Sequence, residues 1–191
     1  MRWRVDGPQT LTGFLQISVL GGVSLLLGLF AIAASSRRVA DQPEAPAPEF
    51  AGPRLQFPVP SVSTAAMADS FGDRRGSRTH QAVDIFAPRH SPVVAVDDGT
   101  IARLLRSTAG GITVYQFDSF ERYCYFYAHL ETYAAGLAEG QSVKRGQVLG
   151  YVGTSGNAPP NTPHLHFAIS QVSVAKQWWG GSPIDPYPMW P

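Results

Sequence analysis

Four of the five histidines in this 191-residue chain, together with one aspartate, have the types and spacing of a mononuclear zinc site. His80 and Asp84 lie four residues apart in RTHQAVDIF, and His129 lies in YFYAHLE. His164 and His166 form an H-x-H pair in TPHLHFAI. Two imidazoles and one carboxylate around zinc, with a fourth position open to water, are a ligand set of hydrolytic metal centres.

The sequence around Asp84 indicates a strand that would present its carboxylate. Val83 and Ile85 flank Asp84, so a strand would bury these two side chains and turn Asp84 to the opposite face. His80 precedes this strand and follows the turn-rich GDRRGSRT, from where a loop could fold it back towards Asp84. Taken alone, the pair is a weak signal, because two polar residues at this spacing are common.

The H-x-H pair is more informative, because side chains two apart on a strand share one face. A strand would place His164 and His166 about 6–7 Å apart and point Leu165 and Phe167 into the core. The alternative is a pair of histidines on a solvated sheet face. His129 ends an aromatic strand, where a buried or rim histidine is the alternative to an active-site residue.

Two further residues have simpler interpretations. His90, in PRHSP, has no partner at a useful spacing, so we expect it in a surface loop. The single cysteine, Cys124, lies in the apolar run RYCYFYAHL and is predicted to be a buried thiol rather than a nucleophile.

Composition favours an all-β fold. The chain holds 19 Gly and 16 Pro with 15% charged residues, and its net charge of +1 gives no basic face for nucleic acid. Short runs rich in β-branched and aromatic residues predict an antiparallel β-sandwich or barrel. Asp-Gly in DDGTI (97–101) predicts a hairpin, and one short helix is weakly indicated over 132–140. The candidate strands are 92–96, 99–105, 111–117, 123–130, 147–153 and 164–170.

The N-terminal part predicts a membrane anchor and a tether. Residues 11–34 are 24 uncharged residues, enough to cross a ~30 Å hydrocarbon layer as a helix. A cleaved signal peptide is the alternative, because AIAA resembles a cleavage site, but the apolar stretch is long for one. The predicted organisation is a tail (1–10), a transmembrane signal anchor (11–34), a Pro-rich linker (35–60) and a domain (61–191, core 67–170).

Several segments together resemble one family. RTHQAVDIFAPRHSPVVAVDDGTI, YAHL, EGQSVKRGQVLGYVGTSGN and PHLHF are similar, in this order, to the lysostaphin-type (LytM-like) zinc metallopeptidases that cut peptide bonds in peptidoglycan. The resemblance implies one Zn²⁺ per domain, held by His80, Asp84 and His166. It implies that His129 and His164 are the two further active-site histidines, which would handle protons during hydrolysis.

The resemblance also implies a fold related to lipoyl and biotinyl carrier domains, which explains the carrier-like phrase GQSVKRGQVLGYVG. A working carrier is disfavoured, because Lys144 lacks the setting of a modifiable lysine. We therefore expect a single-pass protein of the bacterial cytoplasmic membrane with its catalytic domain on the periplasmic or extracellular side. Its expected partners are that membrane and peptidoglycan peptides. The alternative is a non-catalytic module that binds peptidoglycan or activates another hydrolase.

Two segments outside the histidines also have expected places in the fold. The Gly- and Pro-rich loop 153–163 leads directly into His164 and is expected to form one wall of the substrate groove, the alternative being a mere connector. Trp178, Trp179 and Trp190 lie in a C-terminal tail that could pack over the domain or meet a partner.

Overall fold

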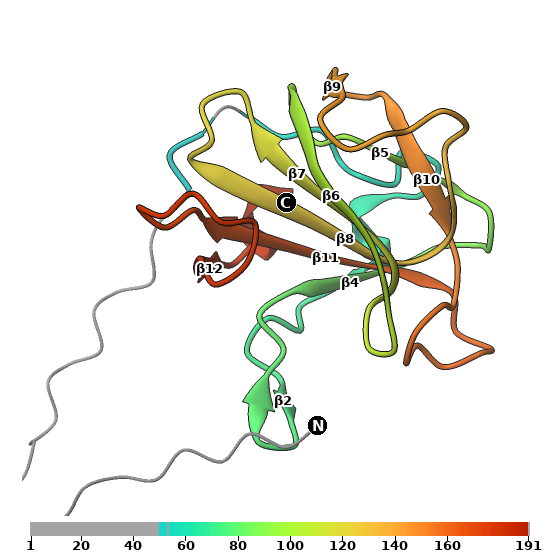
Figure 1. Ribbon diagram of the computed structural model, residues 1–191. Coiled ribbons are helices and arrows are strands. Elements are labelled where there is room, and N and C mark those ends of the chain that lie inside the picture. The colour runs from blue at the N-terminus through green and yellow to red at the C-terminus, as the bar shows by residue number, and fades with distance from the viewer. Residues whose placement is uncertain (1–49, 53, 191) are drawn as a thin grey trace, which may run out of the picture. The chain divides into compact units, whose positions relative to one another are not determined.

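The computed structural model describes residues 50–52 and 54–190 (Figure 1). The predicted tail over 1–10, the membrane anchor over 11–34 and the linker up to residue 49 lie outside these described residues. Within the described part of the chain, no helix is both long and apolar enough to cross a membrane.

The described residues form strands and two single-turn 3-10 helices, which confirms the predicted all-β class. The strands are β1 Met67–Ala68, β2 Arg74–Arg75, β3 Arg78–Thr79, β4 Val83–Phe86, β5 Pro92–Val94, β6 Gly99–Ser107, β7 Gly111–Asp118, β8 Tyr123–Tyr133, β9 Ser142–Val143, β10 Val148–Val152, β11 His164–Gln171 and β12 Ser182–Ile184; the 3-10 helices are η1 Thr64–Ala66 and η2 Tyr187–Met189.

One ten-stranded antiparallel sheet contains all strands except β2 and β3, which form a separate hairpin. Its main order is β1-β4-β11-β8-β7-β6-β9, while β10 pairs with both β5 and β8, and β12 pairs with β11. Figure 1 shows β8 and β11 as neighbouring long strands in the middle of the sheet, with the β2–β3 hairpin extending away from β4. All six predicted strands are present, with ends shifted by a few residues.

Large side chains from the central strands fill the core. Tyr125 and Tyr127 on β8, and Leu165 and Phe167 on β11, are fully buried. Each pair is two residues apart, so the period-two alternation of a strand directs both members to the same face. The opposite face of these strands is therefore available for polar side chains.

Two local predictions were wrong. The segment 97–101 is not a hairpin, because β5 pairs with β10 while β6 pairs with β7 and β9. A type I′ turn requires positive φ at both central residues, and neither Asp98 nor Gly99 has it. The Asp98 carboxylate instead accepts hydrogen bonds from Lys144 Nζ and the Arg145 amide, both at 2.9 Å. No helix forms over 132–140, where β8 runs on to Tyr133 and turns follow.

The end of the segment predicted as a linker packs on the sheet. Leu55 and Val59 are buried, and the Gln56 amide donates to the Val96 carbonyl at 2.8 Å. Burial of these apolar side chains stabilises the segment on the sheet despite its prolines. The linker therefore ends before residue 55, not at residue 60 as predicted.

The C-terminal tryptophans differ in environment. Trp190 is buried, and its indole N–H donates to the Leu55 carbonyl at 3.2 Å. Trp179 is 52% exposed, and its ring lies 4.8 Å from that of Trp178. Only Trp190 therefore belongs to the core.

Candidate metal centre

Strand register places two of the predicted ligands opposite each other. β4 and β11 are antiparallel neighbours, in which His166 faces Asp84 and Leu165 faces Ile85. Directly opposed residues share a face of the sheet, so the imidazole and the carboxylate meet on one side while Leu165 and Ile85 are fully buried on the other. The alternation predicted for both segments is confirmed.

A turn before β4 returns His80 to the same place. The His80 amide donates to the Asp73 carbonyl at 2.8 Å, and Gln81 has a left-handed φ of 56° that redirects the chain into β4. The His80 ring has Nδ1 3.0 Å from the Ser70 carbonyl oxygen. Because a carbonyl only accepts, Nδ1 carries the proton and Nε2 keeps its lone pair towards the site.

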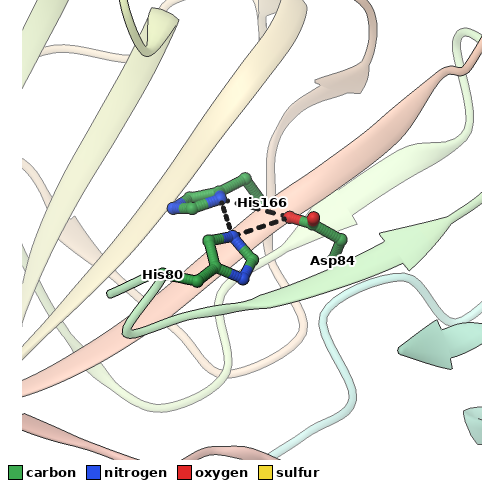
Figure 2. Close-up of side chains that lie close together, drawn as sticks. All are labelled: His80, Asp84 and His166. Atoms are coloured by element: carbon green, nitrogen blue, oxygen red, sulfur yellow. Dashed lines mark hydrogen bonds and ion pairs between the residues drawn. The ribbon is translucent and has the colours of Figure 1, made fainter. Parts of the chain in front are cut away.

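The three predicted ligands converge on a space suited to one ion (Figure 2). His80 Nε2, Asp84 Oδ1 and His166 Nδ1 are the atoms that face each other. His80 Nε2 lies 3.3 Å from Asp84 Oδ1 and 2.9 Å from His166 Nδ1, and His166 Nδ1 lies 3.1 Å from Asp84 Oδ1. Neighbouring ligands on tetrahedral zinc are about 3.3 Å apart, given bonds of ~2.0–2.1 Å. The donor set and its spacing therefore fit zinc.

The carboxylate of Asp84 divides its two oxygens between the ligand cluster and an arginine. Oδ1 faces the two imidazoles, and Oδ2 accepts a hydrogen bond from the Arg75 guanidinium at 2.6 Å. Burial alone would raise the pKa of Asp84, but the contacts of its carboxylate with the His166 and His80 imidazoles and the hydrogen bond from Arg75 outweigh burial and hold this pKa well below its usual range. Asp84 is thus an anion across the physiological range, as a metal ligand must be.

His129 reaches the site through a β-bulge. In regular alternation His129 would follow Tyr125 and Tyr127 into the core, but the β7–β8 register shifts between Ile112 and Val114. His129 has a φ of 61° there, and Leu130 takes the buried position instead. Bulges redirect side chains in this way next to active sites. The His129 ring lies 5.0 Å from that of His164 and 5.6 Å from that of His166, measured between centroids.

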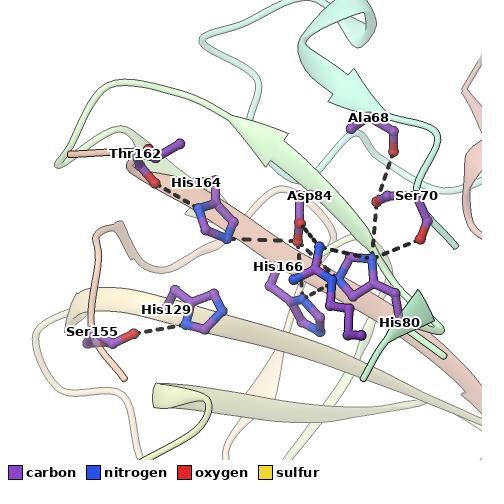
Figure 3. A network of polar contacts seen from close by, with 10 residues as sticks. Ala68, Ser70, His80, Asp84, His129, Ser155, Thr162, His164 and His166 are labelled. Carbon is purple, nitrogen blue, oxygen red and sulfur yellow. Dashed lines mark hydrogen bonds and ion pairs between the residues drawn. The ribbon is translucent and has the colours of Figure 1, made fainter. Parts of the chain in front are cut away.

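The two remaining histidines are oriented alike by one loop (Figure 3). His129 Nδ1 lies 2.8 Å from the Ser155 carbonyl oxygen, and His164 Nδ1 lies 2.8 Å from that of Thr162. Both Nδ1 atoms therefore carry the proton, which leaves each Nε2 as an acceptor. The Nε2 of His164 is 3.8 Å from Asp84 Oδ1. Burial lowers the pKa of His129 to about 4, so its ring is neutral near pH 7.

Two adjoining hollows flank the ligand cluster, with cavity volumes of about 460 and 360 Å³. They share His80, Gln81, Tyr115, Phe126 and His166, so an extended chain could pass from one to the other across the ligands. Of loop 153–163, Asn157 lines the larger hollow. The loop also supplies the Ser155 and Thr162 carbonyls that hold His129 and His164. The sequence predicted a wall of the groove but not this second role.

The residues set aside by their sequence context lie apart from the ligand cluster. His90 is exposed in a loop. Cys124 is buried, its thiol donates to the Trp178 carbonyl at 3.6 Å, and burial raises its pKa to about 12. Arg75 was missed, although the RRGSR run just before His80 places cations within reach of Asp84. The carbonyls of Ser70, Ser155 and Thr162 were also missed, because main-chain contacts leave no mark on residue type.

Comparison with known proteins gives one family. The model described as Peptidase family M23 matches residues 78–186, which include all four site histidines and Asp84. The chain is 36% identical over 140 residues to the L-Ala--D-Glu endopeptidase of Bacillus subtilis, covering 69% of this chain and 41% of that protein.

Solved structures agree with this result. The catalytic domain of the antimicrobial peptidase lysostaphin from Staphylococcus simulans superposes with a TM-score of 0.54 at 27% identity, covering 64% of this chain and 89% of that one. Helicobacter pylori Csd3 gives a TM-score of 0.56 at 28% identity, covering 72% of this chain and 33% of that one. The present chain thus spans about two fifths of the length of the Bacillus relative and matches one third of Csd3.

Proposed function

Because the chain belongs to peptidase family M23, we propose that it is a zinc endopeptidase that hydrolyses peptide bonds in peptidoglycan. The observation that carries this proposal is the convergence of three ligand atoms beside two imidazoles whose Nε2 atoms remain free to exchange protons. The names of the relatives support a peptide substrate, since one is an L-Ala--D-Glu endopeptidase and another an antimicrobial peptidase.

The donor set favours zinc over harder cations. His80 and His166 supply nitrogen and Asp84 supplies oxygen, whereas Mg²⁺ and Ca²⁺ prefer ligands that are all oxygen. When bound, zinc supplies Lewis-acid chemistry: it acidifies water and polarises a carbonyl group. The Ser70 carbonyl, by fixing the His80 tautomer, keeps Nε2 directed at the ion's place.

His129 and His164 are assigned the proton transfers that peptide hydrolysis requires. One proton must leave the attacking water, and one must reach the departing amine. His129 is assigned the first transfer, because the Ser155 carbonyl holds its Nδ1 proton and leaves Nε2 with a free lone pair. His164, on the neighbouring strand and held by Thr162, is assigned the second.

We also propose that the catalytic domain is tethered outside the cytoplasmic membrane by residues 11–34. The support is the uncharged, apolar sequence of this segment and the prolines that follow it, between residues 43 and 60. Peptidoglycan lies on that side of the membrane, so the proposed substrate requires this orientation.

Digestion of defined peptidoglycans tests the enzymatic assignment. The purified full chain, loaded with zinc, is incubated with cell walls of several cross-link chemistries, and mass spectrometry identifies the new amino and carboxyl ends. We expect cleavage that a chelator stops and that zinc restores. His166→Ala, which removes one ligand atom, is expected to be inactive. Failure to cleave any wall while still binding it would indicate a non-catalytic module.

A further inference from the structure

A tight hairpin holds two arginines over the larger hollow. β2 and β3 pair with Arg75 opposite Arg78, and Gly76 at the turn has a φ of 68°, as the first central residue of a type II′ hairpin requires. Opposed residues point to one face of a β-ribbon, and both arginines line the hollow. Arg74, one residue before Arg75, does not line it.

The two hollows together form one groove across the ligand cluster, and the larger hollow is its cationic side. The described residues that line the larger hollow include no Asp or Glu. Arg75 is neutralised by Asp84, whose other oxygen faces the ligand imidazoles. Arg78 is exposed and makes no ion pair with any residue in the described part of the chain.

The other side of the groove has a different character. The smaller hollow is lined by Trp178, Trp179, Tyr115 and Phe126, and no Arg, Lys, Asp or Glu lines it within the described residues. An extended chain that crosses the ligands would thus meet cationic groups on one side and uncharged aromatic groups on the other. The groove is polarised along its length.

We infer that Arg78 binds a free carboxylate of the peptide substrate, on the side of the scissile bond that occupies the larger hollow. This inference rests on the proposed function for the identity of the substrate as a peptide. A guanidinium presents a planar fork of donors that matches a carboxylate, and such charge-assisted pairs are stronger than neutral hydrogen bonds. Arg78 is therefore a specificity residue, which selects an anionic peptide over its uncharged analogue.

The test compares stem peptides of peptidoglycan that have a free glutamate carboxyl group with the same peptides in which it is a carboxamide. Binding to the zinc-loaded full chain is followed by tryptophan fluorescence, and cleavage by chromatography. We expect the native chain to prefer the carboxylate by about tenfold in Kd, as for hydrogen bonds to charged groups. R78Q should reduce this preference to near one, and R78K should retain part of it, because lysine keeps the charge without the fork.

Arg74 provides the matched control. It is an exposed arginine on the same hairpin, outside the hollow, so R74Q removes the same charge and should leave the preference unchanged. The inference is overturned if the native chain binds both peptides equally, or if R74Q and R78Q lower the preference to the same extent. Selective binding without cleavage would instead contradict the proposed hydrolysis while supporting the role of Arg78.

Discussion

Replacing His129 with asparagine should remove turnover while leaving zinc bound. Asparagine cannot accept a proton at neutral pH, yet it tolerates the left-handed backbone that His129 adopts at a φ of 61°. Alanine would add backbone strain to the loss of the imidazole. The substitution therefore removes the proton-accepting nitrogen without straining the backbone of the bulge.

The structure indicates how far the turnover rate of His129→Asn should fall. The Ser155 carbonyl fixes the His129 tautomer at 2.8 Å, and with a pKa of about 4 nearly every molecule has a neutral ring at pH 7. Loss of a positioned general base lowers the rate by about 10²–10⁴-fold. That range corresponds to about 3–5 kcal/mol in the activation barrier. The stability should fall by only about 1–2 kcal/mol, since one carbonyl loses its partner.

The assay pairs kcat on peptidoglycan with zinc content measured by mass spectrometry of the native protein. His90 offers a matched control, because it is an exposed histidine with a φ of 68° outside the site. His90→Asn should keep both zinc and activity, and His166→Ala should lose both. If His129→Asn lost its zinc, or kept its full rate, the division between ligand and proton-handling histidines would be wrong.

The remaining predictions concern the core and the thiol. Tyr127→Phe should lower the free energy of unfolding by about 2 kcal/mol, because two buried groups lose the Tyr127 hydroxyl as their hydrogen-bond partner. These groups are Gln116 Oε1, at 2.8 Å, and the Val96 amide, at 3.1 Å. Urea denaturation measures the change, and a variant as stable as the native chain would refute the prediction. Tyr133→Phe is the half-buried comparison and should have a smaller effect. Cys124 should resist iodoacetamide from pH 7 to 9 and react only as the pH approaches about 12 or the chain unfolds, because burial raises its pKa and the thiolate is the reactive form. Rapid alkylation of the folded protein at pH 8 would contradict that expectation.

Sequence alternation predicted the parts of the site that lie on regular strands. The neighbours of the site residues are all fully buried, namely Val83 and Ile85 around Asp84 and Leu165 and Phe167 around the histidine pair. The period-two alternation of a strand was therefore sufficient to predict which side chains face the site. Six strands could be predicted for the same reason, since each combines apolar and β-branched residues between turns.

The irregular parts depended on contacts that a single sequence does not contain. The direction of the His129 side chain follows from a bulge that depends on pairing with β7. Asp-Gly at 98–99 is typical of a hairpin, yet Asp98 is bound by Lys144 and Arg145, and the flanking strands pair elsewhere. Tertiary pairing decides such local choices.

The loop between β10 and β11 gives His129 and His164, the two histidines proposed to transfer protons, a common support made of main-chain atoms. Ser155 and Thr162 each hold one imidazole through a carbonyl, and the Ser155 hydroxyl ties the loop back to β8 through the Leu130 carbonyl. Many substitutions at Thr162 would preserve its carbonyl, whereas inserting or deleting one residue would displace the carbonyls from the imidazoles that they hold. Evolution should therefore conserve the length of this loop more strictly than its composition, and a single protease cut within it should abolish the proposed activity without loss of bound zinc.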